Sequence, residues 1–406
     1  MAAILAFPID LIRIFNESIS LFRIFLILAL ISTSLFILEQ MKIPNINRIA
    51  VSWIIIGFSS SILAFLFSLD NSYAKSALLN DLSGIMLVFT VLMNYSVDDI
   101  DVLLKAFVLS QLSAIPFSIY TIRLFGNMAS IFNNITFLGI FTLKLDYSQT
   151  IETIQNLRLF LPYSSATALS VTMAASIVVL IYKGNYLFGR ILKSILLILY
   201  SALMVFSQSR TGIVALFIVI LVYTIIRSFK TRSFKLASRF VVVFLVLVAI
   251  SSFIIRTSNS AIIEKFVKRI KYELAQSIFD NRHFLVPLEG LRIWLSSPSS
   301  FIFGIGYGGN AHFIGKWTYL PDNSFLNSFV TVVAQKGLLG LFMIFLWIIL
   351  YNKTVRYSKA IGSYHLTILW AVLLVSCLFY ELYQTSTFWT VLAITLLASQ
   401  EKFERA

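Results

Sequence analysis

The sequence predicts an all-α fold, a polytopic bundle of transmembrane helices, and three observations lead to this prediction. Of the 406 residues, 59% are hydrophobic and only 12% are charged, whereas a soluble domain carries about 25% charged residues. The mean hydropathy is +0.89. Eleven apolar runs come close to the roughly 20 residues that a helix needs to cross a bilayer. This composition excludes a cytosolic globular enzyme and a disordered protein, and a single cysteine, Cys377, excludes a disulfide scaffold.

We expect one membrane domain, 1–406, with about 11–12 spans. Residues 2–16 are apolar but short and carry Asp10 and Arg13, so they predict either a twelfth, partial span or an interfacial helix. No cleavable signal peptide is evident. In chain order, the eleven candidate spans are 19–38, 49–69, 77–95, 101–122, 164–182, 190–206, 210–226, 237–255, 325–351, 363–380 and 386–400.

Basic residues between the spans predict the orientation. Residues 227–239 hold five basic side chains and no acid, and 183–193 and 352–362 are basic too. All three segments fall on one side of the membrane, which is then the cytoplasmic side of a multi-pass protein in the cytoplasmic (inner) membrane. The acidic turn Asp98–Asp101 also falls there, but acids contribute little to this rule. The net charge of +14 follows from these loops, so we expect no nucleic-acid partner.

Two long segments then fall on the outer side, 123–163 and 257–324. Function concentrates on such loops, so the larger one, 257–324, is expected to carry much of the site. Residues 262–278 within it place apolar side chains at helical spacing opposite four basic ones. This pattern predicts an amphipathic helix, either along the outer membrane interface or packed on the rest of the loop.

The first motif with chemistry, Ser207-Gln208-Ser209-Arg210-Thr211-Gly212, joins two apolar runs. It predicts a tight helix–helix turn that puts Arg210 at the outer mouth of the bundle. A guanidinium there is suited to clamp a phosphate or pyrophosphate through its planar fork of donors. The alternative is an arginine that extends to lipid headgroups.

The second motif combines Arg282, His283, Glu289 and Arg292 with the glycine run that follows, Gly304-Ile305-Gly306-Tyr307-Gly308-Gly309. Such a run permits positive φ and a close backbone approach to a ligand. It lacks the Lys-Ser/Thr of a nucleotide loop, so it predicts a turn and no nucleotide.

The third motif is Asp322-Asn323, at the head of a predicted helix. The pair is either an N-cap or a carboxylate at the outer entrance, facing Arg210. His312 lies in the same loop, and His283 is a second histidine of this loop that could take part in the site. The sequence has no metal-binding motif, so we expect no metal and no other cofactor.

In this order, the motifs resemble the O-antigen polymerase/ligase superfamily of membrane glycosyltransferases. The matching residues are Ser209-Arg210-Thr211-Gly212, Arg282 with Trp294, Gly304 to Gly308, Asp322 to Leu326, Gly337-Leu338-Leu339-Gly340, and Arg158 in the segment before the middle span. The resemblance implies a GT-C-like helical fold and a reaction at the outer (periplasmic) face with a polyprenyl-pyrophosphate-linked glycan. Membrane lipid, a chain-length regulator and a flippase are further implied partners. The ligase branch commonly has His where this chain has Asp322, which favours the polymerase branch.

In this reading, Arg210, Arg158 and Arg282 stabilise the charge that develops on the leaving pyrophosphate, so no metal is needed. The general base stays open between Asp322, His312 and Glu289. We expect Ser209, Thr211, Arg292, Tyr307 and Asn323 to contact substrate. Two alternatives to a repeat-unit polymerase remain: a ligase of the same superfamily, and a transporter or flippase.

Overall fold

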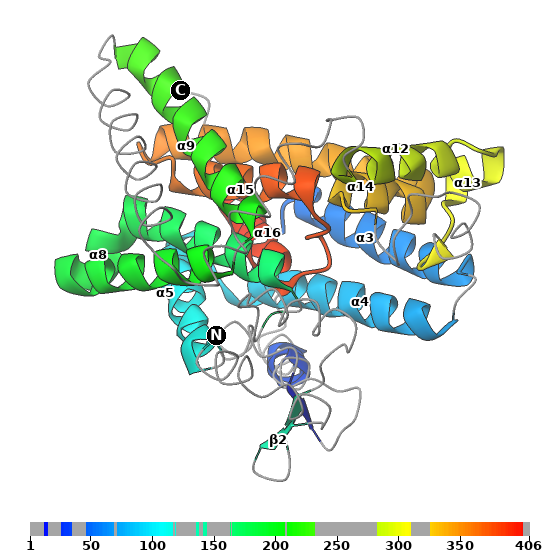
Figure 1. Ribbon diagram of the computed structural model, residues 1–406, viewed down its shortest axis with the longest axis horizontal. Coiled ribbons are helices and arrows are strands. Elements are labelled where there is room, and N and C mark those ends of the chain that lie inside the picture. Colours follow the sequence, from blue (N-terminus) through cyan, green and yellow to red (C-terminus); the bar gives the residue numbers. More distant parts are fainter. Residues whose placement is uncertain are drawn as a thin grey trace, which may run out of the picture.

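The computed structural model is a bundle of helices in which α3, α4, α8 and α14 run along one long axis and α5 and α9 are steeply inclined to it, with two short helices at one end and a small sheet at one side (Figure 1). It describes residues 12–14, 26–34, 46–68, 71–116, 118, 135–137, 141–143, 163, 165–207, 209–231, 282–309 and 325–400. The helices are α3 (Arg48–Leu66), α4 (Asn71–Asn94), α5 (Ile100–Ser110), α8 (Ala166–Phe206), α9 (Arg210–Thr231), α12 (Arg282–Trp294), α13 (Pro298–Phe303), α14 (Ser328–Ala360), α15 (His365–Phe379) and α16 (Ser386–Ala398). Two single turns of 3-10 helix, η2 (Val97–Asp99) and η3 (Gln111–Ser113), flank α5.

The surface of the bundle confirms a polytopic membrane protein. Five helices in the described part of the chain are long and apolar enough to cross a membrane, and α15 and α16 are shorter but also apolar. Large aliphatic side chains point outward, for example Ile198 at 73% and Ile226 at 61% exposure. Three tryptophans, Trp53, Trp347 and Trp370, are buried between helices instead. An apolar exterior of this kind is stable only against lipid.

The longest helix, α8, consists of two antiparallel arms. Gly189 interrupts it with φ +73°, a value that glycine adopts without steric cost. The Ser170 hydroxyl donates to the Ser209 carbonyl at 3.0 Å, although 39 residues separate them. A straight helix would put about 58 Å between these residues. The chain therefore turns back at Gly189, and both predicted spans, 164–182 and 190–206, are present.

Helix α14 is broken as well, which the sequence analysis did not predict. Gly337 has φ +59°, and a Cβ added to Gly340 would lie 2.3 Å from the Val332 carbonyl. In a continuous helix, residues eight apart are about 12 Å apart. The first arm, 328–336, thus folds against the start of the second, and the crossing arm begins after Gly337. One continuous span over 325–351 is wrong for this reason.

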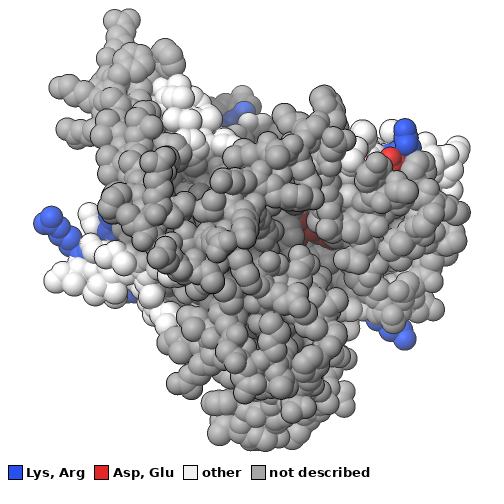
Figure 2. Space-filling view, in the orientation of Figure 1, with Lys and Arg blue, Asp and Glu red and all other residues white. Residues whose placement is uncertain are grey.

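The arms alternate in direction, so the bundle has two ends. At the end that we call the basic end, Lys183 forms an ion pair with Asp101 at 3.0 Å, and the Asn47 amide donates to the Ser399 carbonyl. Figure 2 shows basic atoms at this end, where α8 turns back. At the opposite end, called the glycine end, the Tyr307 amide donates to the Ala64 carbonyl at 3.1 Å. The turn between α15 and α16 lies near this end as well, because the Tyr383 hydroxyl is bonded to Gln335.

Three-residue strands form the small antiparallel sheet, with the order β1-β3-β2: β1 (Ile12–Ile14), β2 (Ile135–Phe137) and β3 (Phe141–Leu143). Ile12 pairs with Leu143, and Thr136 with Thr142. β-branched and aromatic residues dominate these segments and favour extended backbone. The helical interpretation of residues 2–16 is therefore wrong at 12–14.

Most of the remaining spans agree with the prediction. Helix α5 ends at Ser110, and the 3-10 turn η3 and a helical turn over 114–116 follow it, so the described part of the predicted span 101–122 is helical with one 3-10 interruption. Span 237–255 and the amphipathic segment 262–278 lie outside the described residues.

Candidate active site at the glycine end

Hydrogen bonds to α8 fix the turn before α9. The Ser209 hydroxyl donates to Thr167 Oγ1 at 3.1 Å, and Ser209 is buried. A Cβ on Gly212 would lie 2.4 Å from Ser170 Oγ, so glycine allows α9 to pack directly on α8. Arg210 is the first residue of α9, and its side chain is exposed. Helix α8 ends at Phe206 and α9 begins at Arg210, so this motif joins two helices as predicted and places a guanidinium beside the amides that begin a helix.

Helix α12 holds the second group of predicted residues. Arg292 Nη1 lies 3.2 Å from Glu289 Oε1, one turn away on the same helix. Figure 2 shows basic and acidic atoms next to each other in the region of α12. Glu289 is mostly buried, and its second oxygen has no hydrogen-bond partner in the described part of the structure. Arg282 opens α12, and its side chain is outside what the structure describes.

An apolar contact between α12 and the first arm of α14 holds this second group in place. Val286, Ile293 and Trp294 form a buried cluster with Phe325 and Val330. A Cβ on Gly290 would lie 2.7 Å from the Phe325 ring, so the two helices approach closely here. Just before α14, Leu326 has φ +56°, a conformation that a branched side chain adopts only under strain.

The glycine run connects two distant parts of the bundle through its backbone. The amides of Ile305 and Gly306 donate to the Ala334 and Gln335 carbonyls at 2.8 and 3.2 Å. On the other side, the Ser68 hydroxyl donates to the Tyr307 carbonyl at 2.6 Å. The run is thus the predicted turn with positive φ, and the backbone that it approaches closely belongs to this chain.

Replacing Gly304 by alanine is expected to destabilise the protein strongly. Its φ is +78°, and an added Cβ would lie 2.4 Å from the Gln335 carbonyl. Gly362 is the matched control, because its φ is +68° but nothing lies within 4 Å of an added Cβ. Both substitutions place a Cβ at positive φ, which costs about 1–3 kcal/mol, and only Gly304→Ala adds a backbone clash. Thermal unfolding in detergent should show a clearly larger loss for Gly304→Ala, and equal losses would contradict the close packing.

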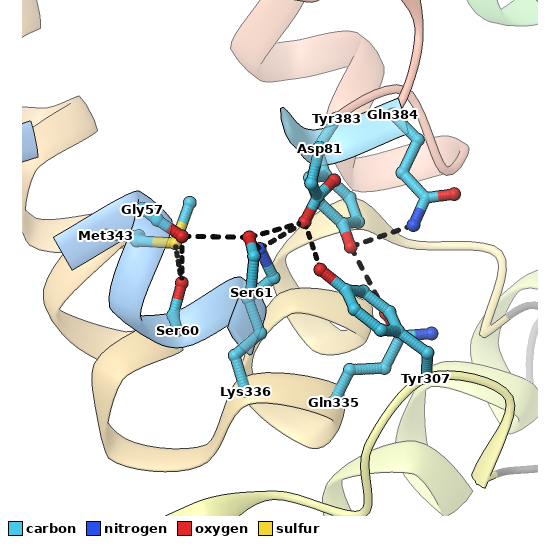
Figure 3. A network of polar contacts seen from close by, with 10 residues as sticks. All are labelled: Gly57, Ser60, Ser61, Asp81, Tyr307, Gln335, Lys336, Met343, Tyr383 and Gln384. Atoms are coloured by element: carbon cyan, nitrogen blue, oxygen red, sulfur yellow. Dashed lines mark hydrogen bonds and ion pairs between the residues drawn. The ribbon is translucent and has the colours of Figure 1, made fainter. Parts of the chain in front are cut away.

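Behind the glycine run, a fully buried ion pair joins α4 to the break in α14. Lys336 Nζ lies 2.5 Å from Asp81 Oδ2, and both side chains have no exposed surface. Ser61 Oγ of α3 lies 3.0 Å from each of these two atoms. The Tyr307 hydroxyl donates to the same Asp81 oxygen at 2.5 Å (Figure 3). Asp81 therefore receives donors from three separate elements.

Aromatic rings and an amide complete this network. Lys336 Nζ lies 5.8 Å from the centre of the Tyr307 ring and 5.3 Å from that of Tyr383. The Tyr383 hydroxyl donates to Gln335 Oε1 at 3.2 Å and accepts from the Gln384 amide (Figure 3). Burial raises the pKa of Tyr383 well above its ordinary value, and the Asp81 carboxylate raises it further, so the phenol keeps its proton.

Sequence reasoning found only one member of this network. Tyr307 was predicted to contact substrate, whereas the structure buries it and directs its hydroxyl to Asp81. Asp81 and Lys336 were not among the candidate residues. The available signal was their charge inside apolar runs, since ionisable residues within membrane spans are costly and usually functional.

Several predicted residues cannot be placed together. Arg158, His312, Asp322 and Asn323 lie outside the described residues, so their convergence with Arg210 stays a prediction. In the part of the chain that the structure describes, no group of three or more His, Cys, Asp or Glu residues could hold a metal ion.

The fold defines a multi-pass helical membrane protein with a buried ion pair behind the glycine run and an exposed guanidinium at the head of α9. Residues 194–345 match the family model of the O-antigen ligase domain, Wzy_C. The match runs from the second arm of α8 into α14 and includes Arg210, the glycine run and Lys336. This match, over part of the chain, supports the resemblance to the O-antigen polymerase/ligase superfamily, and that family implies a glycosyltransferase-like enzyme that acts on lipid-linked glycans. No curated protein matches the chain.

Proposed function

We propose that this protein is a polysaccharide repeat-unit polymerase. It transfers a glycan from a polyprenyl-pyrophosphate donor to a second lipid-linked glycan at the outer face of the cytoplasmic membrane. The observation that carries the proposal is Arg210, exposed at the head of α9 within the matched family domain. Asp322 stands where the ligase branch commonly has His, and this favours the polymerase.

The orientation rests on charge. Lys183, Arg190 and Lys193 lie where α8 turns back, and Lys359 ends α14 at the same end of the bundle. Basic loops stay in the cytoplasm, which puts the glycine end outside. A lipid-linked glycan displayed at the outer face would then meet Arg210 directly.

The reaction breaks the bond between the sugar C1 and the pyrophosphate oxygen, and the pyrophosphate leaves with the electron pair. The acceptor hydroxyl forms the new C1–O bond and gives up its proton to a base. Arg210 offers a planar fork of donors to the departing anion, and the first amides of α9 add a positive helix terminus. Arg158 and Arg282 are the further cations of this proposal, and it needs no metal ion.

Three residues are candidates for the general base: Asp322, His312 and Glu289. Glu289 is held by Arg292, so it is already paired in the absence of substrate. The chain-length regulator and the flippase are proposed partners of this reaction.

One observation favours a second function. The matched family model describes an O-antigen ligase, which would transfer the finished glycan to lipid A core or another acceptor. Both functions use the same donor and the same leaving group, so Arg210 would have the same task in each. They differ only in the acceptor.

Deletion of the gene tests the proposal and separates the two functions. A polymerase predicts loss of the long-chain ladder on gels of surface glycan, while acceptors that carry a single repeat unit remain. A ligase predicts that glycan disappears from the acceptor altogether and accumulates on polyprenyl pyrophosphate. An unchanged ladder would overturn both.

A further inference from the structure

The buried Asp81 carboxylate is bonded to two segments that are separate in the chain. Tyr307 belongs to the glycine run after α13, and Lys336 ends the first arm of α14. Both donate to the same oxygen, Asp81 Oδ2 (Figure 3). One side chain of α4 thus ties together the two segments.

These two segments enclose the part of the sequence with the most candidate chemistry. Residues 310–324 begin directly after Gly309 and end before Phe325, and they include His312, Asp322 and Asn323. The Asp81 carboxylate therefore holds the two described segments that border, in sequence, the segment predicted to carry the base.

The charges of the pair call for an explanation beyond packing. Burial of an ion pair costs more free energy than it returns unless its hydrogen bonds are well satisfied. Here Asp81 Oδ1 and Gln335 Nε2 are buried and have no hydrogen-bond partner in the described part of the structure. An apolar contact would join the same helices without this cost, so stability alone is a poor reason for the pair. Charges retained inside a membrane bundle usually serve function.

We propose that Asp81 and Lys336 are positioning residues, which rests on the proposed function. They fix the glycine run and the first arm of α14 relative to each other, and thereby set the geometry of glycosyl transfer, without contact to the glycan. Tyr307 is the link through which the glycine run is held.

The Tyr307→Phe variant tests this inference, because it removes the hydroxyl and keeps the ring. Tyr200→Phe is the matched control, since Tyr200 is also fully buried and its hydroxyl donates to the Val108 carbonyl at 2.6 Å, away from the network. With purified protein and lipid-linked repeat units, Tyr307→Phe should lower kcat about tenfold or more with little change in KM, because misplaced groups react slowly. Tyr200→Phe should keep kcat within about twofold. A folded Tyr307→Phe protein with wild-type kcat would overturn the inference.

A second measurement tests whether Asp81 holds the glycine run in place, and it does not depend on enzymatic activity. In a C377S background, I305C places a thiol in the glycine run, and its labelling rate with a maleimide reports how firmly the run is held. Adding Tyr307→Phe should raise this labelling rate about tenfold, whereas adding Tyr200→Phe should leave it unchanged. If the Tyr307→Phe protein does not accumulate, the double substitution Asp81→Asn with Lys336→Met takes its place and should have the same effect. An unchanged labelling rate would contradict the claim that Asp81 holds the glycine run through Tyr307. If the wild-type protein elongates no glycan, the proposed function fails, and the labelling result still stands for or against the tie.

Discussion

Lys336→Met alone is expected to lower the free energy of unfolding by about 3–5 kcal/mol. The substitution keeps the volume of the side chain but leaves the Asp81 carboxylate buried without its cation, and both side chains have no exposed surface. Adding Asp81→Asn removes the second charge and should restore most of the loss. Thermal unfolding in detergent measures both effects.

The matched control is the ion pair at the basic end. Lys183 and Asp101 lie 3.0 Å apart, but their side chains are 22% and 29% exposed, so water and ions solvate both partners. Lys183→Met should therefore cost only about 0–1 kcal/mol. Equal losses for Lys183→Met and Lys336→Met, or no recovery in the double variant, would contradict a buried charge pair at the break of α14.

Arg210→Ala is expected to lower the rate of glycan transfer by about 10²–10³-fold, as the loss of a single donor to a developing anion does in other enzymes. The side chain is exposed at the head of α9 and contributes little to the buried core, so the protein should accumulate normally. Arg210→Lys should recover only part of the rate, because an ammonium group offers a point charge in place of a planar fork. Complementation of the deletion strain, read as the length distribution of surface glycan, measures the effect.

Arg190→Ala is the control for this substitution. Arg190 is also exposed, but it lies beside Gly189 at the basic end, so its loss should leave the ladder intact. A normal ladder from a well-expressed Arg210→Ala variant would mean that this guanidinium has no part in the reaction.

Most helices could be predicted from the sequence because a membrane span is a local property of composition. The break at Gly189 falls between two apolar runs, and basic residues mark it on both sides. The break at Gly337 is different, because only the short polar pair Gln335-Lys336 precedes it and long apolar runs continue on both sides. Hydropathy gives no signal there, and only the contact between Gly304 and the Gln335 carbonyl shows why the helix must bend.

The candidate site was predictable only in part. Arg210, Glu289, Arg292 and the glycine run were found from motifs that are short in sequence. The ion pair joins residues 255 positions apart, and no local pattern relates Asp81 to Lys336. Tyr307 was singled out for its place in a glycine run, but its hydroxyl faces inward because α3 and α4 pass behind the run.

The central claim is that this protein transfers glycan from a polyprenyl-pyrophosphate donor with Arg210 at the leaving group. The most direct measurement uses purified protein in nanodiscs and the lipid-linked repeat unit isolated from the deletion strain. The account predicts that the wild-type protein forms products of two and more repeat units, releases polyprenyl pyrophosphate and remains active in EDTA, while Arg210→Ala does so about 10²–10³-fold more slowly. Absence of elongated product from the wild-type protein, or equal rates for the two proteins, would contradict it.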